Sequence, residues 1–133
     1  MTAMRVYIPV SAGDLIDKIT ILEIKKARIP DKKKLANVDT ELQSLIAIRN
    51  CFPKLLQKAI HGKERRLRKA NQVLWDTEDE IRALEAAGRF DKAFVAAARR
   101  VYRTNDQRAK LKADINTLAG SALREEKWFS ENP

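Results

Sequence analysis

The chain has 133 residues, of which 44% are hydrophobic and 34% are charged, and its formal net charge is +9. One cysteine and one histidine exclude an intramolecular disulfide and a structural zinc site, so we expect no metal and a reducing, cytoplasmic location. Only four glycines and four prolines are present, and this scarcity favours helix almost throughout. We therefore expect one all-α domain over residues 1–133.

The apolar segments give no indication of export or membrane insertion. No apolar run approaches the roughly 20 residues that a membrane-spanning helix needs. Residues 1–10 carry one arginine and lack the apolar centre of a signal peptide. They are instead predicted to form a short extended arm, because Val6, Tyr7 and Ile8 favour β structure and Pro9 prevents a central strand. We expect this arm to pack on the helices or on a partner.

The first helix is predicted over residues 11–29, with Ser11 as its N-cap and Asp14 in its first turn. Its apolar residues occupy two faces, which indicates burial on two sides, either in a bundle or at an oligomer interface. Glu23 lies within the main apolar stripe. A buried carboxylate needs a cation or a proton, and we expect Arg108 to be its partner.

Two further helices are predicted before the middle glycine-containing turn. Apolar residues at alternating spacings of three and four predict a helix over residues 31–51, typical of an antiparallel pairing. A third helix is expected over residues 54–87, where Gly62 leaves open a break or kink. Gly88 follows as the residue that ends it.

The fourth helix is predicted over residues 91–128, with Asp91 as its N-cap. Gly120 and Ser121 leave open a bend or an end, after which residues 125–129 would form an amphipathic tail. The expected fold is thus about four helices, in a bundle or an elongated array of hairpins, with a short extended N-terminal arm.

Polar residues interrupt the expected pairing of the last two helices. Folding at Gly88 brings Asn71 roughly opposite Asn105, and Trp75 roughly opposite Tyr102. A buried polar layer is costly unless every donor and acceptor is satisfied. It therefore indicates either a device that fixes the helix register or a place where a ligand binds, and the sequence leaves both open.

The basic residues offer an alternative function. An acidic block at residues 76–85 is expected to face Arg99, Arg100 and Arg103 across the hairpin, so that part of the charge is compensated. The uncompensated cations would then be Lys63, Arg65, Arg66, Arg68 and Lys69. Such a stripe can bind phosphate backbones without sequence preference. No helix-turn-helix, zinc finger or aromatic platform accompanies it, so a solvated basic face is favoured over a nucleic-acid site.

Enzymatic motifs are scarce. Four scattered glycines cannot form a phosphate loop, and no metal-binding motif is visible, so we expect no cofactor. Cys51 and His61 are better explained as a structural thiol and a surface histidine than as a nucleophile and its base. The segment from Ile16 to Ile19, with Arg28 downstream, faintly resembles the first helix of the all-helical chorismate mutases. That resemblance covers about fifteen residues of types common in amphipathic helices.

A broader resemblance covers nearly the whole chain. The segments VSAGDLIDKITILEIK (10–25), LANV (35–38), LWDTEDEI (74–81), FDKAF (90–94) and VYRTNDQR (101–108) resemble a small bacterial family of unknown function. The resemblance implies an association with genes for cell-surface polysaccharide synthesis, which suits an accessory protein. Together with Asn71, the polar positions in these segments are the candidate ligand-binding or partner-binding residues: Asp14, Asp17, Lys18, Glu23, Trp75, Glu78, Asp79, Tyr102, Asn105, Asp106 and Arg108.

We therefore expect a non-enzymatic interaction or scaffold protein. It would form a homo-oligomer through an exposed face of the first helix or through the apolar seam of the second. It would also bind a protein partner that the sequence does not identify. The alternatives are a nucleic-acid-binding protein that uses the basic stripe and, third, a helical enzyme of the chorismate mutase type.

Overall fold

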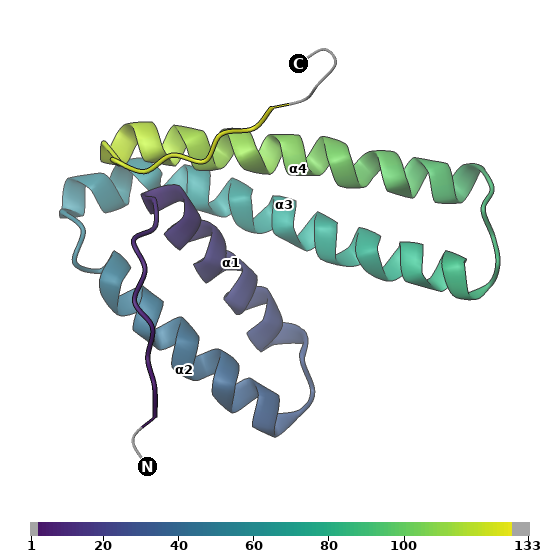
Figure 1. The fold of residues 1–133 in the computed structure, drawn as a ribbon, viewed down its shortest axis with the longest axis horizontal. Coiled ribbons are helices and arrows are strands. Elements are labelled where there is room, and N and C mark those ends of the chain that lie inside the picture. Colours follow the sequence, from purple (N-terminus) through teal and green to yellow (C-terminus); the bar gives the residue numbers. More distant parts are fainter. Residues whose placement is uncertain (1–2, 129–133) are drawn as a thin grey trace.

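The computed structural model describes residues 3–128, which form two antiparallel helical hairpins (Figure 1). The helices are α1 (Ala12–Arg28), α2 (Lys32–Arg49), α3 (Lys54–Ala86) and α4 (Lys92–Ala119). The all-α prediction is confirmed, and no strand occurs between residues 3 and 128. None of the helices in this part of the chain has the length and apolar character needed to cross a membrane.

Helix α1 lies at the centre and contacts the other three helices. The side chains of Ile16 and Ile19 are completely buried, which agrees with the two apolar faces seen in the sequence. Val38 and Leu42 of α2 join the same apolar core. The two faces from which self-association was expected are therefore covered within a single chain, because α1 and α2 use them to pack on each other and on α3 and α4.

The long hairpin of α3 and α4 extends beyond the region that α1 covers (Figure 1). Helix α3 has 33 residues and continues through Gly62 without a break. Gly88 adopts a φ of +65°, and the N–H of Arg89 bonds to the carbonyl of Leu84, so the helix ends in a left-handed glycine turn. This turn reverses the chain and places α4 alongside α3.

Helix α4 begins at the predicted cap Asp91, whose carboxylate accepts from the N–H groups of Ala93 and Phe94. It ends at Ala119, nine residues before the expected end, and residues 121–128 are not helical. Gly120 takes a left-handed conformation, with φ at +65°, which turns the chain out of the helical path. The expected amphipathic tail is thus extended over residues 125–128, and Phe129 lies outside the described residues.

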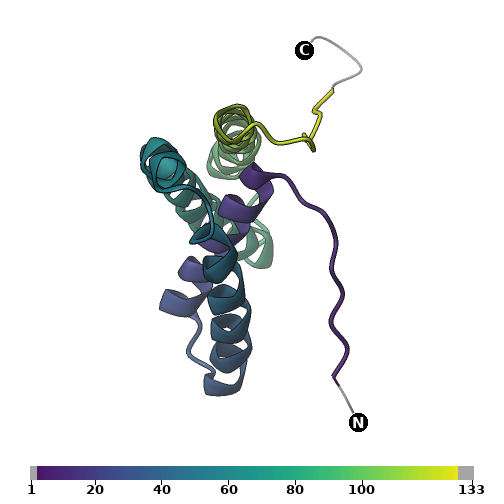
Figure 2. The same ribbon diagram turned by 90° about the vertical axis from the view of Figure 1, so that its left-hand side faces the viewer.

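The N-terminal arm, residues 3–10, stands clear of α1 and α2 (Figure 2). Tyr7 remains 83% exposed and Ile8 71% exposed, so the arm does not pack on the helices. The other expectation, that it packs on a partner, stays a prediction. A groove of about 830 Å³ separates the arm from an apolar surface that includes Leu45 and Phe52. The arm is therefore the part of the described chain that is most open to a partner.

Candidate functional site

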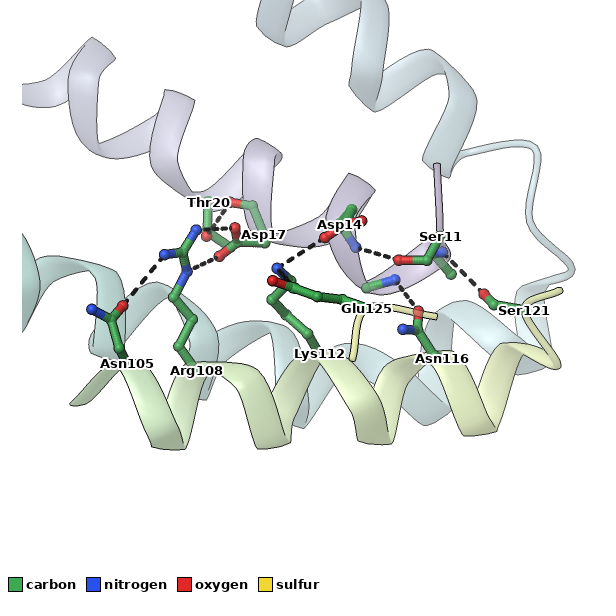
Figure 3. A network of polar contacts seen from close by, with 12 residues as sticks. Ser11, Asp14, Asp17, Thr20, Asn105, Arg108, Lys112, Asn116, Ser121 and Glu125 are labelled. Atoms are coloured by element: carbon green, nitrogen blue, oxygen red, sulfur yellow. Dashed lines mark hydrogen bonds and ion pairs between the residues drawn. The ribbon is translucent and has the colours of Figure 1, made fainter. Parts of the chain in front are cut away.

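A series of polar contacts joins α1 to α4 (Figure 3). Arg108, Lys112 and Asn116 lie one turn apart on α4, and each side chain reaches the first two turns of α1. We call these three residues and their partners on α1 the polar ladder. Two of its contacts are charged pairs and the third is a hydrogen bond to the backbone of α1, so the ladder fixes both the distance and the register between the two helices.

At one end of the polar ladder, α1 approaches α4 very closely. The Oδ1 atom of Asn116 accepts a hydrogen bond of 2.6 Å from the N–H of Gly13. A Cβ atom on Gly13 would lie 2.5 Å from the carbonyl oxygen of Lys112, too short for any real contact. Glycine is required here because the two backbones leave no room for a side chain. Next to this contact, Ser121 Oγ accepts a 3.0 Å hydrogen bond from the N–H of Ala12.

Asp17 lies at the other end of the ladder, where three helices meet. Its carboxylate accepts two bonds from Arg108, Nε to Oδ1 at 2.8 Å and Nη2 to Oδ2 at 2.5 Å. Asn71 of α3 donates to the same Oδ1 at 2.9 Å and to the hydroxyl of Thr20 at 2.9 Å. The Asp17 side chain is only 7% exposed, so its charge is compensated by partners on α3 and α4 rather than by water.

The electrostatics of the ladder follow from these contacts. The hydrogen bonds that Arg108 donates to the Asp17 carboxylate raise the pKa of the Arg108 guanidinium above its usual value. Burial acts to lower the pKa of Lys112, but the carboxylates of Glu125 (2.5 Å) and Asp14 (2.9 Å) outweigh it, and the net shift is upward. Both cations therefore stay charged at neutral pH and hold their anionic partners.

The expected pair between Glu23 and Arg108 is wrong. Arg68 Nη2 donates to the two carboxylate oxygens of Glu23 at 3.1 and 3.2 Å, whereas Arg108 is held by Asp17. Asp17 and Glu23 are six residues apart, about one and two-thirds turns of helix, and so point to different sides of α1. Arg68 also lies 3.5 Å from Glu64, which places it in a second network that joins α1 to α3.

Beside Asp17 and Asn71 opens a cleft of about 500 Å³, lined by α1, α3 and α4. Its polar lining residues are Asn71, Glu78, Asp79, Arg82, Asn105 and Arg108, and its apolar and aromatic ones are Ile21, Ile24, Leu74 and Trp75. Six of the candidate residues from the sequence meet here: Asn71, Trp75, Glu78, Asp79, Asn105 and Arg108. They come from two segments about thirty residues apart, which the hairpin turn brings together.

Several polar groups in this cleft have unused hydrogen-bonding capacity. Glu78, Asp79 and Arg82 make no hydrogen bond or ion pair with any residue that the structure describes. The Nη1 atom of Arg108 has one contact, a marginal 3.5 Å bond to Asn105 Oδ1. The cleft thus offers carboxylate acceptors, guanidinium donors and apolar residues around one opening.

Trp75 forms the aromatic part of the cleft. The guanidinium of Arg28 lies 5.9 Å from the centre of the indole ring and is held there by an ion pair with Asp76. The sequence predicts Trp75 roughly opposite Val101 and Tyr102, but neither of these two residues lines the cleft, and Tyr102 is 55% exposed. Asn71 and Asn105 do line the same cleft, but each bonds to another residue rather than to its counterpart.

The remaining candidates lie elsewhere. Lys18 pairs with Glu41 of α2 at 2.7 Å, and Asp106 pairs with Lys127 at 2.8 Å, both on exposed surfaces. Asp14 belongs to the polar ladder through Lys112. These residues stabilise contacts between segments of the chain and do not contribute to the cleft.

Two of the five cations in the basic stripe form ion pairs with carboxylates. Lys63 pairs with Asp114 at 3.3 Å, and Arg68 is directed inward to Glu23 and Glu64. Arg65, Arg66 and Lys69 are exposed and have no ion pair within the described residues. The five cations therefore do not form one continuous surface, which weakens the nucleic-acid alternative.

The predicted ion pairing between the acidic block of α3 and the arginines of α4 does occur farther along the hairpin, where Arg100 meets Glu80 at 2.8 Å.

Sequence reasoning missed Lys112, Asn116 and Gly13 in the ladder, and Arg82 in the cleft. The four-residue spacing of 108, 112 and 116 carried a signal, because it places three polar side chains on one face of a helix. Gly13 carried none, since only the approach of α4 explains it. No group of three or more His, Cys, Asp or Glu side chains between residues 3 and 128 is arranged to hold a metal.

The fold and the site define a small helical protein whose two hairpins are joined by a buried polar ladder and share one open cleft. The chain belongs to a family of unknown function, DUF6165, which matches residues 4–132. No curated protein and no solved structure matches it. Membership in a family of unknown function is therefore confirmed.

Proposed function

We propose that this protein is a non-enzymatic binding protein and that the cleft between α1, α3 and α4 holds its ligand. One observation carries the proposal. Six polar and aromatic residues that the sequence indicates as candidates line a single opening. Glu78, Asp79 and Arg82 line this opening, are exposed, and make no side-chain hydrogen bond or ion pair within the described residues, so all three are available to a ligand.

The chemistry of the cleft favours an uncharged ligand that carries many hydroxyl groups. Glu78, Asp79 and the free donors of Arg82 and Arg108 suit hydroxyl groups, which both donate and accept hydrogen bonds. The indole of Trp75 and its apolar neighbours suit the C–H face of a sugar ring. The adjacent carboxylates would repel a dicarboxylate, which argues against a site of the chorismate mutase type.

The resemblance to a family associated with surface-polysaccharide genes agrees with this chemistry. We therefore place the protein as an accessory in bacterial cell-surface polysaccharide synthesis, acting by holding a sugar or a glycan end. The proposal includes self-association, for which the exposed arm at residues 3–10 is the candidate surface.

Tryptophan fluorescence provides the test, because the chain has two tryptophans and Trp75 lines the cleft. In a Trp128→Phe background Trp75 is the only indole. Titration with glucose, galactose and N-acetylglucosamine should give a saturable change with at least one of these uncharged sugars, whereas a change with glucuronate alone would contradict an uncharged ligand.

Matched variants separate the cleft from general surface effects. Glu78→Gln combined with Asp79→Asn should abolish the change, because it removes both charged acceptors at nearly constant volume. Glu41→Gln combined with Asp106→Asn alters two exposed carboxylates outside the cleft and should leave it intact. A sugar site would be contradicted if both double variants lost the fluorescence change equally, or if no sugar changed the fluorescence.

A further inference from the structure

Two ion pairs link α3 to α4, and several cations near these pairs on the same two helices have no anionic partner within the described residues. Arg100 meets Glu80 toward the turn, and Lys63 meets Asp114 toward the other end. The Lys63–Asp114 pair lines one groove between the two helices, together with three further cations that have no ion pair within the described residues: Arg66, Lys69 and Lys110. Asp114 is the only carboxylate in this lining and already pairs with Lys63, so the groove carries an excess of positive charge that a bound anion would balance.

The groove has a volume of about 490 Å³, within the range of small-molecule sites. It shares no lining residue with the cleft. Its apolar lining residues are Ala70, Val73 and Leu111. A ligand here would therefore meet an apolar surface and a set of cations in one opening.

Thr104 supplies an independent observation at the same place. It lines the groove and is only 6% exposed, yet its hydroxyl makes no hydrogen bond with any residue in the described part of the chain. The threonines at positions 40 and 117, by contrast, donate to the carbonyl four residues back in their own helix. The hydroxyl oxygen is not itself completely buried, because Arg68 Nε is the only buried side-chain N or O atom without a partner among the described residues. The hydroxyl is therefore accessible from the groove, and a ligand oxygen could accept its hydrogen bond.

We propose that this groove binds the phosphate group of a small anionic ligand. A phosphate carries up to two negative charges and several acceptor oxygens, so it can accept from Arg66, Lys69 and Lys110 at once. The hydroxyl of Thr104 donates to a further oxygen. The apolar lining residues contact the uncharged part of the ligand. This site is independent of the proposed sugar cleft, and either can fail without the other.

Amide chemical shifts in nuclear magnetic resonance spectra, recorded with inorganic phosphate and with pyrophosphate, test the site. Saturable shifts are expected at residues 66–73 and 104–111, with pyrophosphate binding more tightly because it carries more charge. Lys69→Gln combined with Lys110→Gln should weaken pyrophosphate binding at least about tenfold, since each lost cation removes a charge-assisted hydrogen bond.

The matched control is Lys58→Gln combined with Arg65→Gln, two exposed cations of α3 outside the groove. It makes the same change in net charge and should leave the affinity within about twofold. Thr104→Val keeps the volume and the charge, and should weaken binding about three- to tenfold.

Three results would overturn the proposal. The first is an equal loss of affinity in the control pair, which would indicate general attraction to a basic surface. The second is the absence of shifts around the groove. The third is binding of a single-stranded oligonucleotide of about 12 nucleotides without any binding of pyrophosphate, which would assign the cations to a nucleic-acid backbone.

Discussion

Replacing Gly13 with alanine tests whether the close approach of α1 and α4 determines the stability of the fold. The added Cβ would lie 2.5 Å from the carbonyl oxygen of Lys112 and 2.9 Å from Oδ1 of Asn116. The first atom belongs to the backbone of a helix and cannot rotate away. The two helices must therefore separate, which also stretches the 2.6 Å hydrogen bond from the N–H of Gly13.

Opposing effects set the size of the change. Alanine favours helix over glycine by at most about 1 kcal/mol. Overpacking costs about 1–3 kcal/mol, and weakening the buried hydrogen bond costs about 0.5–1.5 kcal/mol. We expect Gly13→Ala to lower the free energy of unfolding by about 1–3 kcal/mol.

Gly62→Ala is the matched control, because Gly62 lies inside α3 and nothing would meet its Cβ within 4 Å. This variant should raise the free energy of unfolding by about 0.5–1 kcal/mol. Urea unfolding followed by circular dichroism at the helical band measures both variants. If Gly13→Ala proved as stable as Gly62→Ala, the close approach of the helices would not constrain this position, and the reasoning would be refuted.

Three further predictions concern the ladder and the arm. Asp17→Leu should destabilise the fold by about 3 kcal/mol in urea unfolding, because it leaves the Arg108 guanidinium half-buried without its anion. Adding Arg108→Met should recover more than about 1 kcal/mol of this loss. If the effects of the two substitutions simply added, the proposed coupling between Asp17 and Arg108 would be contradicted. The pKa of Lys112 is raised above its ordinary 10.5, so its stabilising effect is complete below pH 10.5 and is lost as the pH rises through the raised pKa. The stability advantage of the unaltered protein over Lys112→Met should therefore stay constant below pH 10.5 and shrink as the pH rises further in urea unfolding, and a gap that remains constant at higher pH would rule this out. A chain without residues 1–10 should lose self-association in light scattering after size exclusion, whereas an oligomer of unchanged size would show that the arm is not the interface.

The candidate site was partly predictable because two kinds of signal identify polar residues in a helix. The first signal is that Asn71 and Asn105 interrupt apolar stripes. The second is helical spacing, because Trp75 lies four residues after Asn71, and Glu78 and Asp79 lie three and four residues after Trp75. The position of Gly88 then brings both segments to one cleft. Which cation meets which carboxylate was not predictable, because it depends on how α1 is rotated against α3 and α4.

The sequence by itself determined the helices, their caps and the two reversals of the chain. Ser11 and Asp91 cap helices because their side chains accept from free N–H groups nearby, and Gly88 ends α3 because it tolerates a positive φ. These are local effects that act over a few residues. They are therefore the same whatever the helices pack against.

Only the tertiary structure decided the pairings between helices. Arg108 meets Asp17 rather than Glu23, and Arg68 turns inward rather than contributing to a basic surface. Such choices depend on the crossing of α1 over the long hairpin, where the backbone at Gly13 lies too close to Lys112 of α4 to admit a side chain. No local pattern in the sequence specifies how α1 is placed and rotated against α3 and α4, and this placement decides which carboxylate each cation meets.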